Sequence, residues 1–180
     1  MPKFNLFVFV FFLFAMFSCT QNETVDAPIE WVQHEATNYS INYPNNWELS
    51  QPGHPGPEFI LFSELTSTDD NFKENINLLT QDLTNQPADL DRFVEISEEQ
   101  AVTLVPDGNI LLSERKKANG LEFHRMIYTG TTGGFQLKFE QYFWVEGNSA
   151  YVLTFTAEED QAEIFESTVN KIFKNFKLDI

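Results

Sequence analysis

The stretch Phe135–Glu146, FQLKFEQYFWVE, decides the fold, because its side chains alternate in character more regularly than those of any other segment. One set is mostly apolar and comprises Phe135, Leu137, Phe139, Gln141, Phe143 and Val145. The other set is polar or aromatic and comprises Gln136, Lys138, Glu140, Tyr142, Trp144 and Glu146. Successive side chains of a strand point to opposite faces of its sheet, so this stretch predicts a strand with at least one buried face.

Short turns join this strand to strand-like segments on either side. Ile110–Lys117 and Leu121–Thr129 precede it, and the alternating residues Tyr151, Leu153 and Phe155 follow it. The turns are Ala118-Asn119-Gly120, Gly130-Thr131-Thr132-Gly133-Gly134 and Gly147-Asn148. Tight turns rich in Asn and Gly connect antiparallel neighbours, so these segments predict a four-stranded antiparallel meander.

Further strands are expected nearer the N-terminus. Tyr39–Tyr43 alternates between apolar and polar residues, and Glu58–Leu65 and Ile76–Leu83 also have the pattern of strands. Residues 51–58, QPGHPGPE, are dominated by Pro and Gly and predict an irregular loop.

Two segments have the 3.6-residue spacing of amphipathic helices. The first runs from about Asp89, which suits an N-cap, to Val105. The second lies near the end of the chain, and Thr156 with Glu159 has the spacing of a capping box before it. Its apolar residues are Ile164, Phe165, Val169, Ile172, Phe173 and Phe176. Strands joined by tight turns, with two helices to cover them, predict an α+β fold with a largely antiparallel sheet.

Composition excludes several classes of function. The 180 residues include 27 Asp+Glu and 11 Lys+Arg, for a net charge of −16, so no nucleic-acid partner is expected. A single Cys excludes cysteine-based zinc sites, iron–sulfur clusters and disulfide frameworks. Residues 29–180 are long enough for one core, and we expect them to form a single domain.

The N-terminus has the pattern of an export signal. Lys3 precedes the uncharged stretch Phe4 to Phe17, and a polar run follows Cys19. A helix over that stretch would be about 21 Å long, short of the roughly 30 Å hydrocarbon core of a bilayer. Residues 1–18 are therefore predicted to be a removed signal peptide, and residues 19–28 a polar tether.

The only Cys directly follows Ser18 at the end of this apolar stretch, which resembles the lipobox of bacterial lipoproteins. The resemblance implies that Cys19 becomes the first residue of the mature chain and carries palmitate-type acyl chains that anchor it to the lipid bilayer. It also implies a cell-envelope location, with the outer membrane favoured because position 20 is not Asp. The alternative is an incidental Cys beside a simple secretory signal or an uncleaved anchor.

Two segments resemble the PsbP/Mog-like superfamily and its branch of uncharacterised bacterial lipoproteins. They are Tyr39–Trp47, YSINYPNNW, and Tyr151–Phe176, which resembles the last strand and closing helix of that family. The resemblance implies an α/β/α sandwich around an antiparallel sheet. Members of the family share binding rather than a common reaction, so it implies no catalytic residues.

The remaining motifs are incomplete as catalytic or metal sites. His34-Glu35 lacks the second His of a zinc protease motif, and His54 and His124 are far apart in sequence. Asp69-Asp70-Asn71 lacks the spaced ligands of a calcium loop, and Thr129–Gly134 lacks the Lys of a phosphate loop. We therefore expect no metal, no cofactor and no enzyme activity.

Two groups of residues are candidates for binding a partner. Lys138, Tyr142 and Trp144 share one face of the best-alternating strand, where exposed aromatic residues and a long cation would suit an interface. The alternative is that a helix covers this face. Arg115, Lys116 and Lys117 form a basic run, whose alternative role is to block edge pairing of a strand.

These observations favour a membrane-anchored envelope lipoprotein that acts as a non-enzymatic binding or accessory subunit, with an envelope protein as its partner. The alternative is a small-molecule-binding or hydrolytic protein with a pocket between sheet and helices, into which His or carboxylate side chains converge. A mainly structural role in the envelope is a third possibility.

Overall fold

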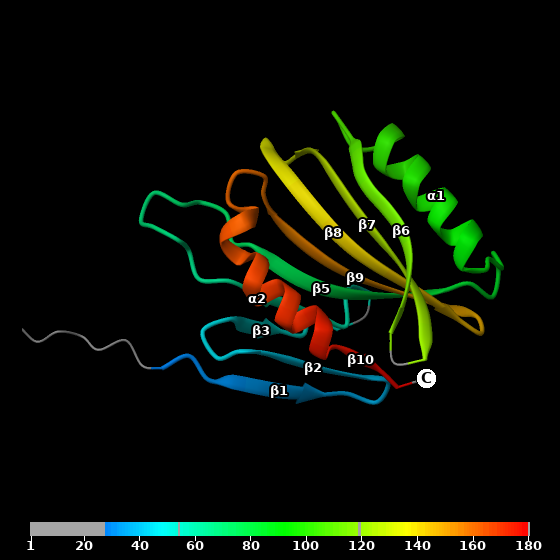
Figure 1. Cartoon of the computed structure of the whole chain (residues 1–180), viewed down its shortest axis with the longest axis horizontal. Coiled ribbons are helices and arrows are strands. Elements are labelled where there is room, and N and C mark those ends of the chain that lie inside the picture. Colours follow the sequence, from blue (N-terminus) through cyan, green and yellow to red (C-terminus); the bar gives the residue numbers. More distant parts are fainter. Residues whose placement is uncertain (1–27, 54, 119, 180) are drawn as a thin grey trace, which may run out of the picture.

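A seven-stranded antiparallel sheet forms the centre of the fold (Figure 1). The computed structural model describes residues 28–53, 55–118 and 120–179, so Cys19 and His54 lie outside the described residues. In spatial order the strands are β3 (Glu48–Ser50), β4 (Phe59–Phe62), β5 (Asn75–Asp82), β9 (Ser149–Glu158), β8 (Phe135–Glu146), β7 (Leu121–Thr132) and β6 (Asn109–Ala118). The predicted meander is confirmed as β6 to β9.

A second, smaller sheet contains β1 (Trp31–Glu35), β2 (Tyr39–Pro44) and β10 (Lys177–Leu178). All three strands are antiparallel, and Lys177 at the end of the chain pairs with Ser40 near its start. The sequence analysis did not predict this separate sheet, because alternation identifies a strand but not its distant partner.

The two helices cover opposite faces of the large sheet (Figure 1). Helix α1 (Leu90–Thr103) packs on β6, β7 and β8, where Phe93 contacts Phe143. Helix α2 (Ala162–Asn175) packs on β9 and also on β2, so it lies between the two sheets. The α+β class and the arrangement of helices on both sides of an antiparallel sheet are therefore confirmed.

The ends of the helices differ in how they are capped. The side chain of Asp89 accepts a hydrogen bond from the backbone N of Arg92 at 2.8 Å, which confirms the predicted N-cap of α1. The predicted capping box before α2 was wrong, because Thr156 belongs to β9 and the N-cap residue, Gln161, makes no side-chain capping bond. The strong β-pattern of this segment extends the strand past the predicted cap.

Alternation along β8 separates two apolar cores. Phe143 belongs to the core under α1, together with Met126 and Val152. Trp144, on the opposite face, belongs to the core shared by α2 and the small sheet. The side chains beside Trp144 line the largest pocket described below.

Candidate functional site

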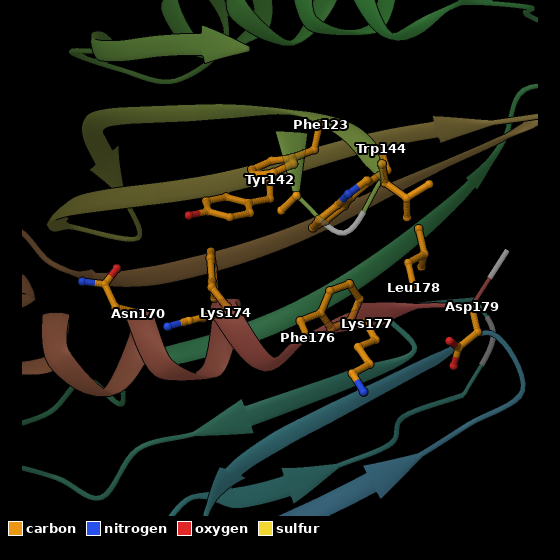
Figure 2. Close-up of a pocket in the computed structure, with 12 residues that line it drawn as sticks. Phe123, Tyr142, Trp144, Asn170, Lys174, Phe176, Lys177, Leu178 and Asp179 are labelled. Carbon is orange, nitrogen blue, oxygen red and sulfur yellow. The ribbon is translucent and has the colours of Figure 1, made fainter. Parts of the chain in front are cut away.

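A pocket of about 680 Å³ lies between the end of the large sheet and the C-terminal part of α2 (Figure 2). Its lining comes from β6, β7, β8, α2, β10 and the residues beside them. The residues are Ala118, Leu121, Phe123, Tyr142, Trp144, Asn170, Phe173, Lys174, Phe176, Lys177, Leu178 and Asp179. Pockets that hold small molecules are typically about 300–1,000 Å³ and mostly apolar, so this pocket has a suitable size and composition.

Packed aromatic rings form the walls of this pocket. The ring of Phe123 stacks on that of Tyr142, with centroids 4.9 Å apart and an interplanar angle of 22°. Tyr142 in turn meets Phe173 of α2 edge to face at 4.7 Å, and Trp144 lies 5.5 Å from Phe176. Ring pairs at these separations stabilise one another, so the walls are held by contacts within the protein itself.

The structure resolves the two alternatives for the aromatic face of β8. Helix α2 covers it: Trp144 is only 8% exposed, Tyr142 is half-buried, and burial raises the pKa of the Tyr142 hydroxyl. Of the two alternatives, the covering helix is therefore the one that the structure shows, and the two rings line a pocket. Lys138 lies apart from them, in a smaller pocket of about 250 Å³ that also includes Glu163 and Glu166 of α2.

The basic run on β6 is not one cationic patch. Arg115 pairs with Asp91 of α1, whereas Lys116 pairs with Glu114 at 2.8 Å. Successive side chains of a strand point to opposite faces, so the alternation of β6 divides Arg115, Lys116 and Lys117 between two sides of the edge strand. Lys116 pairs across the strands with Phe123 and so lies on the face that carries Tyr142 and Trp144, but none of the three basic residues lines the pocket.

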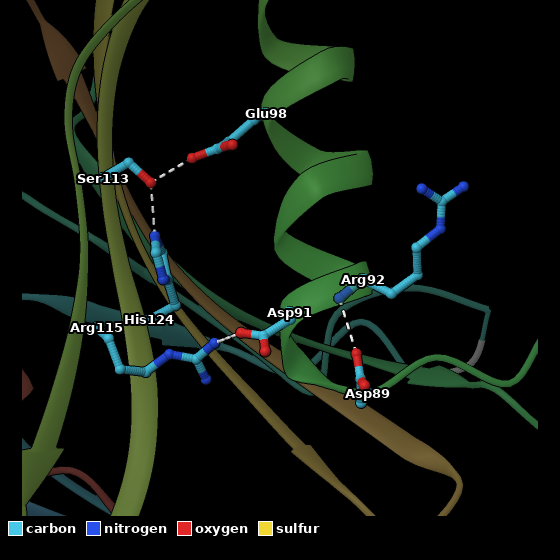
Figure 3. Close-up of polar contacts among 7 residues, drawn as sticks. All are labelled: Asp89, Asp91, Arg92, Glu98, Ser113, Arg115 and His124. Atoms are coloured by element: carbon cyan, nitrogen blue, oxygen red, sulfur yellow. Dashed lines mark hydrogen bonds and ion pairs between the residues drawn. The ribbon is translucent and has the colours of Figure 1, made fainter.

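A polar cluster that sequence analysis missed lies under α1 (Figure 3). The hydroxyl of Ser113 contacts a carboxylate oxygen of Glu98 and lies 2.6 Å from Nε2 of His124. His124 is 8% exposed, and its Nδ1 has no hydrogen-bond partner among the described residues. Burial lowers the pKa of His124, and the nearby Arg115 guanidinium lowers it further.

The geometry of this cluster differs from that of a catalytic triad. In a triad the carboxylate orients the histidine through the ring nitrogen opposite the serine. Here Glu98 contacts Ser113 itself, and Nδ1 of His124 is left unpaired. Neither the aromatic pocket nor the pocket beside Lys138 includes Ser113 or His124. The cluster therefore links α1 to the sheet and lies outside both of these pockets.

Two other residues singled out from the sequence, His34 and Asp70, make local contacts with neighbouring residues. His34 Nε2 lies 3.3 Å from the side-chain amide of Gln51. Asp70 accepts hydrogen bonds from the backbone N of Thr66 and Phe72, and those bonds lower its pKa. No group of three or more His, Cys, Asp or Glu side chains in the described residues is arranged to hold a metal ion. No helix within residues 28–53, 55–118 and 120–179 is both long enough and apolar enough to cross a membrane.

The most informative comparisons are with solved structures, because no protein-family model and no curated protein sequence matches the chain. CyanoP, the cyanobacterial PsbP of Synechocystis, is similar with a TM-score of 0.61 and 13% identity, over 86% of this chain and 95% of CyanoP. LpqN, a Mycobacterium tuberculosis protein involved in cell envelope biogenesis, has a TM-score of 0.58 and 12% identity, over 86% and 94%. A Pseudomonas aeruginosa protein of unknown function has a TM-score of 0.56 and 14% identity, over 81% and 94%.

These similarities define the class of the fold. Identities of 12–14% show shared architecture alone, and the chain has a PsbP-like α+β fold. A shared fold does not imply a shared function, so what the pocket can bind depends on the side chains that line it in this chain.

Proposed function

We propose that this protein is an envelope lipoprotein whose folded domain binds a small apolar molecule in the aromatic pocket, without transforming it. The observation that carries the proposal is the pocket of about 680 Å³ walled by Phe123, Tyr142, Trp144 and Phe173. Transfer of an apolar ligand from water into such a site is favourable by about 25 cal/mol for each Å² buried. Binding without reaction is proposed because no Ser, Cys or His side chain lines the pocket.

The location forms the second part of the proposal. The described domain starts after residues 1–27, which contain the signal-like segment and Cys19. LpqN, which shares the fold, is involved in cell envelope biogenesis, and this favours an envelope location for the present chain. We propose that acylated Cys19 holds the domain at the bilayer, with the outer membrane favoured, and that an envelope protein is its partner there.

The proposed pocket predicts that the protein produced without residues 1–27 binds the uncharged fluorescent probe N-phenyl-1-naphthylamine. Replacing Ala118 with Trp is expected to weaken that binding at least about tenfold, because the larger side chain would fill part of the pocket that Ala118 lines. Fluorescence titration measures the affinity, and a melting curve checks that the variant is folded.

Lys117→Trp is the matched control for the pocket prediction. Lys117 is the preceding exposed residue of the same strand and does not line the pocket. Its replacement should leave probe affinity unchanged. Equal affinities for wild type, Ala118→Trp and Lys117→Trp would place the bound probe elsewhere and refute the pocket as the binding site.

The proposed anchor predicts that the full-length protein, expressed in bacteria with labelled palmitate, carries the label and sediments with membranes. Cys19→Ser should lose both the label and the membrane association, since the thiol is the acylated group. Ser18→Ala keeps a small residue before the Cys and should retain the label. Absence of label from wild type as well as from Cys19→Ser would contradict the anchor.

A further inference from the structure

The described domain begins with two exposed apolar side chains. Ile29 is 62% exposed and Trp31 is 41% exposed, and they are the first large apolar residues in the part of the chain that the structure describes. Neither residue belongs to either of the two cores. Neighbouring apolar side chains left open to water are typical of a surface that contacts a protein or a membrane.

A lysine lies over the exposed tryptophan. The ammonium nitrogen of Lys171, on α2, is 5.9 Å from the centroid of the Trp31 ring, which is a cation–π contact, and Lys171 is itself exposed. Further along β1, the face that carries Trp31 continues with Gln33 and Glu35, whose side chains share a hydrogen bond of 2.7 Å. The apolar surface is therefore confined to the start of β1, with one cation beside it. We call Ile29, Trp31 and Lys171 the β1 patch.

The place of the β1 patch in the chain favours a lipid bilayer as its occupant. The ten residues 19–28 separate the end of the signal-like segment from Ile29, and an extended chain of that length spans at most about 35 Å. An acylated Cys19 would hold the start of β1 within that distance of the bilayer. Figure 1 shows β1 at the periphery of the molecule, on the side opposite α1, where a flat surface can approach it.

The side chains of the β1 patch suit the membrane–water interface. A tryptophan ring lies at the level of the lipid headgroups, with its apolar body against the acyl chains and its N–H near water. A lysine beside it covers apolar surface with its stem and extends its ammonium to the headgroups. The net charge of −16 opposes attraction to anionic lipids, so apolar contact has to supply most of the binding.

We propose that the β1 patch is the surface with which the domain rests on the bilayer, with Trp31 at headgroup level. This inference rests on the acylated anchor of the proposed function. A fully buried large apolar side chain contributes about 1.5–3 kcal/mol, so two are too few to recruit a free domain from solution. Once the anchor is inserted, the short tether gives the patch a high effective concentration at the bilayer, and the same contact becomes populated.

Tryptophan fluorescence tests the contact, because Trp31 is the exposed one of the three tryptophans. Trp47 and Trp144 are 6% and 8% exposed. The full-length acylated protein is reconstituted with phosphatidylcholine vesicles whose acyl chains carry bromine near the headgroup, and bromine quenches a tryptophan that lies close to it. Wild-type emission should be quenched relative to vesicles without bromine, and Trp31→Phe should lose this quenching.

Leu104→Trp, combined with Trp31→Phe, is the matched control. Leu104 is 73% exposed at the end of α1, so the substitution adds an exposed tryptophan on the opposite side of the molecule. Its emission should be the same with and without bromine. Equal quenching of this variant and the wild type would show that no particular face of the domain rests on the bilayer, and would overturn the inference.

Two further outcomes separate the patch from the anchor. A palmitate-labelled wild-type protein that sediments with the vesicles without quenching would overturn the inference and leave the anchor intact, and the β1 patch would then suit a protein partner instead. A wild-type protein that carries no label and does not sediment with the vesicles would overturn the anchor itself, and the inference with it.

Discussion

Gly108→Ala is expected to destabilise the protein by about 3 kcal/mol, a large effect for one added methyl group. A Cβ at this position would lie 2.9 Å from the carbonyl oxygen of Val105 and closer still to that of Ala101. Both obstacles are backbone atoms of the turn that ends α1, so the turn itself would have to move. Urea unfolding of the protein produced without residues 1–27 measures the loss of stability.

Gly120→Ala provides the control for this prediction. Gly120 has a φ of +86°, but a Cβ there would meet nothing within 4 Å. Its cost is therefore limited to the left-handed backbone conformation, about 1–2 kcal/mol. Equal losses at the two positions would contradict the close approach described for Gly108.

The same turn explains how α1 is fixed against the sheet. The backbone N of Thr131 in β7 donates to the carbonyl oxygen of Pro106 at 2.7 Å. Gly130, the preceding residue of β7, lies under the turn, and a Cβ there would press on Val105 and lie 3.1 Å from the oxygen of Pro106. The turn thus holds α1 on one face of β6 to β8, while the aromatic pocket opens on the other face.

Local patterns predicted most of the large sheet. Alternation along β8 divided Phe143 from Trp144 correctly, and the Asn-Gly turn predicted the hairpin of β6 and β7. That turn also sets the register, in which Ala118 faces Leu121 and Arg115 faces His124. The diagonal contact of Ser113 with His124 could therefore have been found from the hairpin, although no motif pointed to it.

The pocket could not be predicted in the same way. Its walls combine Tyr142 of β8 with Phe173 of α2 and with Leu178 of β10. The position of Leu178 depends on the pairing of β10 with Tyr39, far earlier in the sequence. Periodicity shows that each of these residues faces a core. Only the packing of the complete chain shows that a pocket is left between the sheet and the end of α2.

Glu74 is the second residue with a large expected effect on stability. Its carboxyl group is buried, and only one of its two oxygens has a hydrogen-bond partner among the described residues. The residue is 0% exposed, and Oε2 accepts a hydrogen bond from the hydroxyl of Ser63 at 3.0 Å. Oε1 has no partner among the described residues. Burial is the main cause that raises the pKa of Glu74 above its ordinary value of 4.5, and the nearby Asp70 and Glu158 also raise it.

Glu74→Gln is expected to stabilise the protein by about 1–2 kcal/mol at pH 8, because it removes a buried charge and keeps an oxygen that can accept the bond from Ser63. A raised pKa in the folded state means that ionisation of Glu74 opposes folding above that pKa. As the pH falls through the raised pKa toward 4.5, the wild-type carboxyl binds a proton and the difference between the proteins should vanish. Urea unfolding at several pH values measures this trend.

Glu99→Gln, on the exposed part of α1, is the control, and its stability should stay within about 0.5 kcal/mol of wild type at every pH. A Glu74→Gln protein that is less stable than wild type at pH 8 would show that the fold stabilises the ionised carboxylate, contrary to the burial described for it.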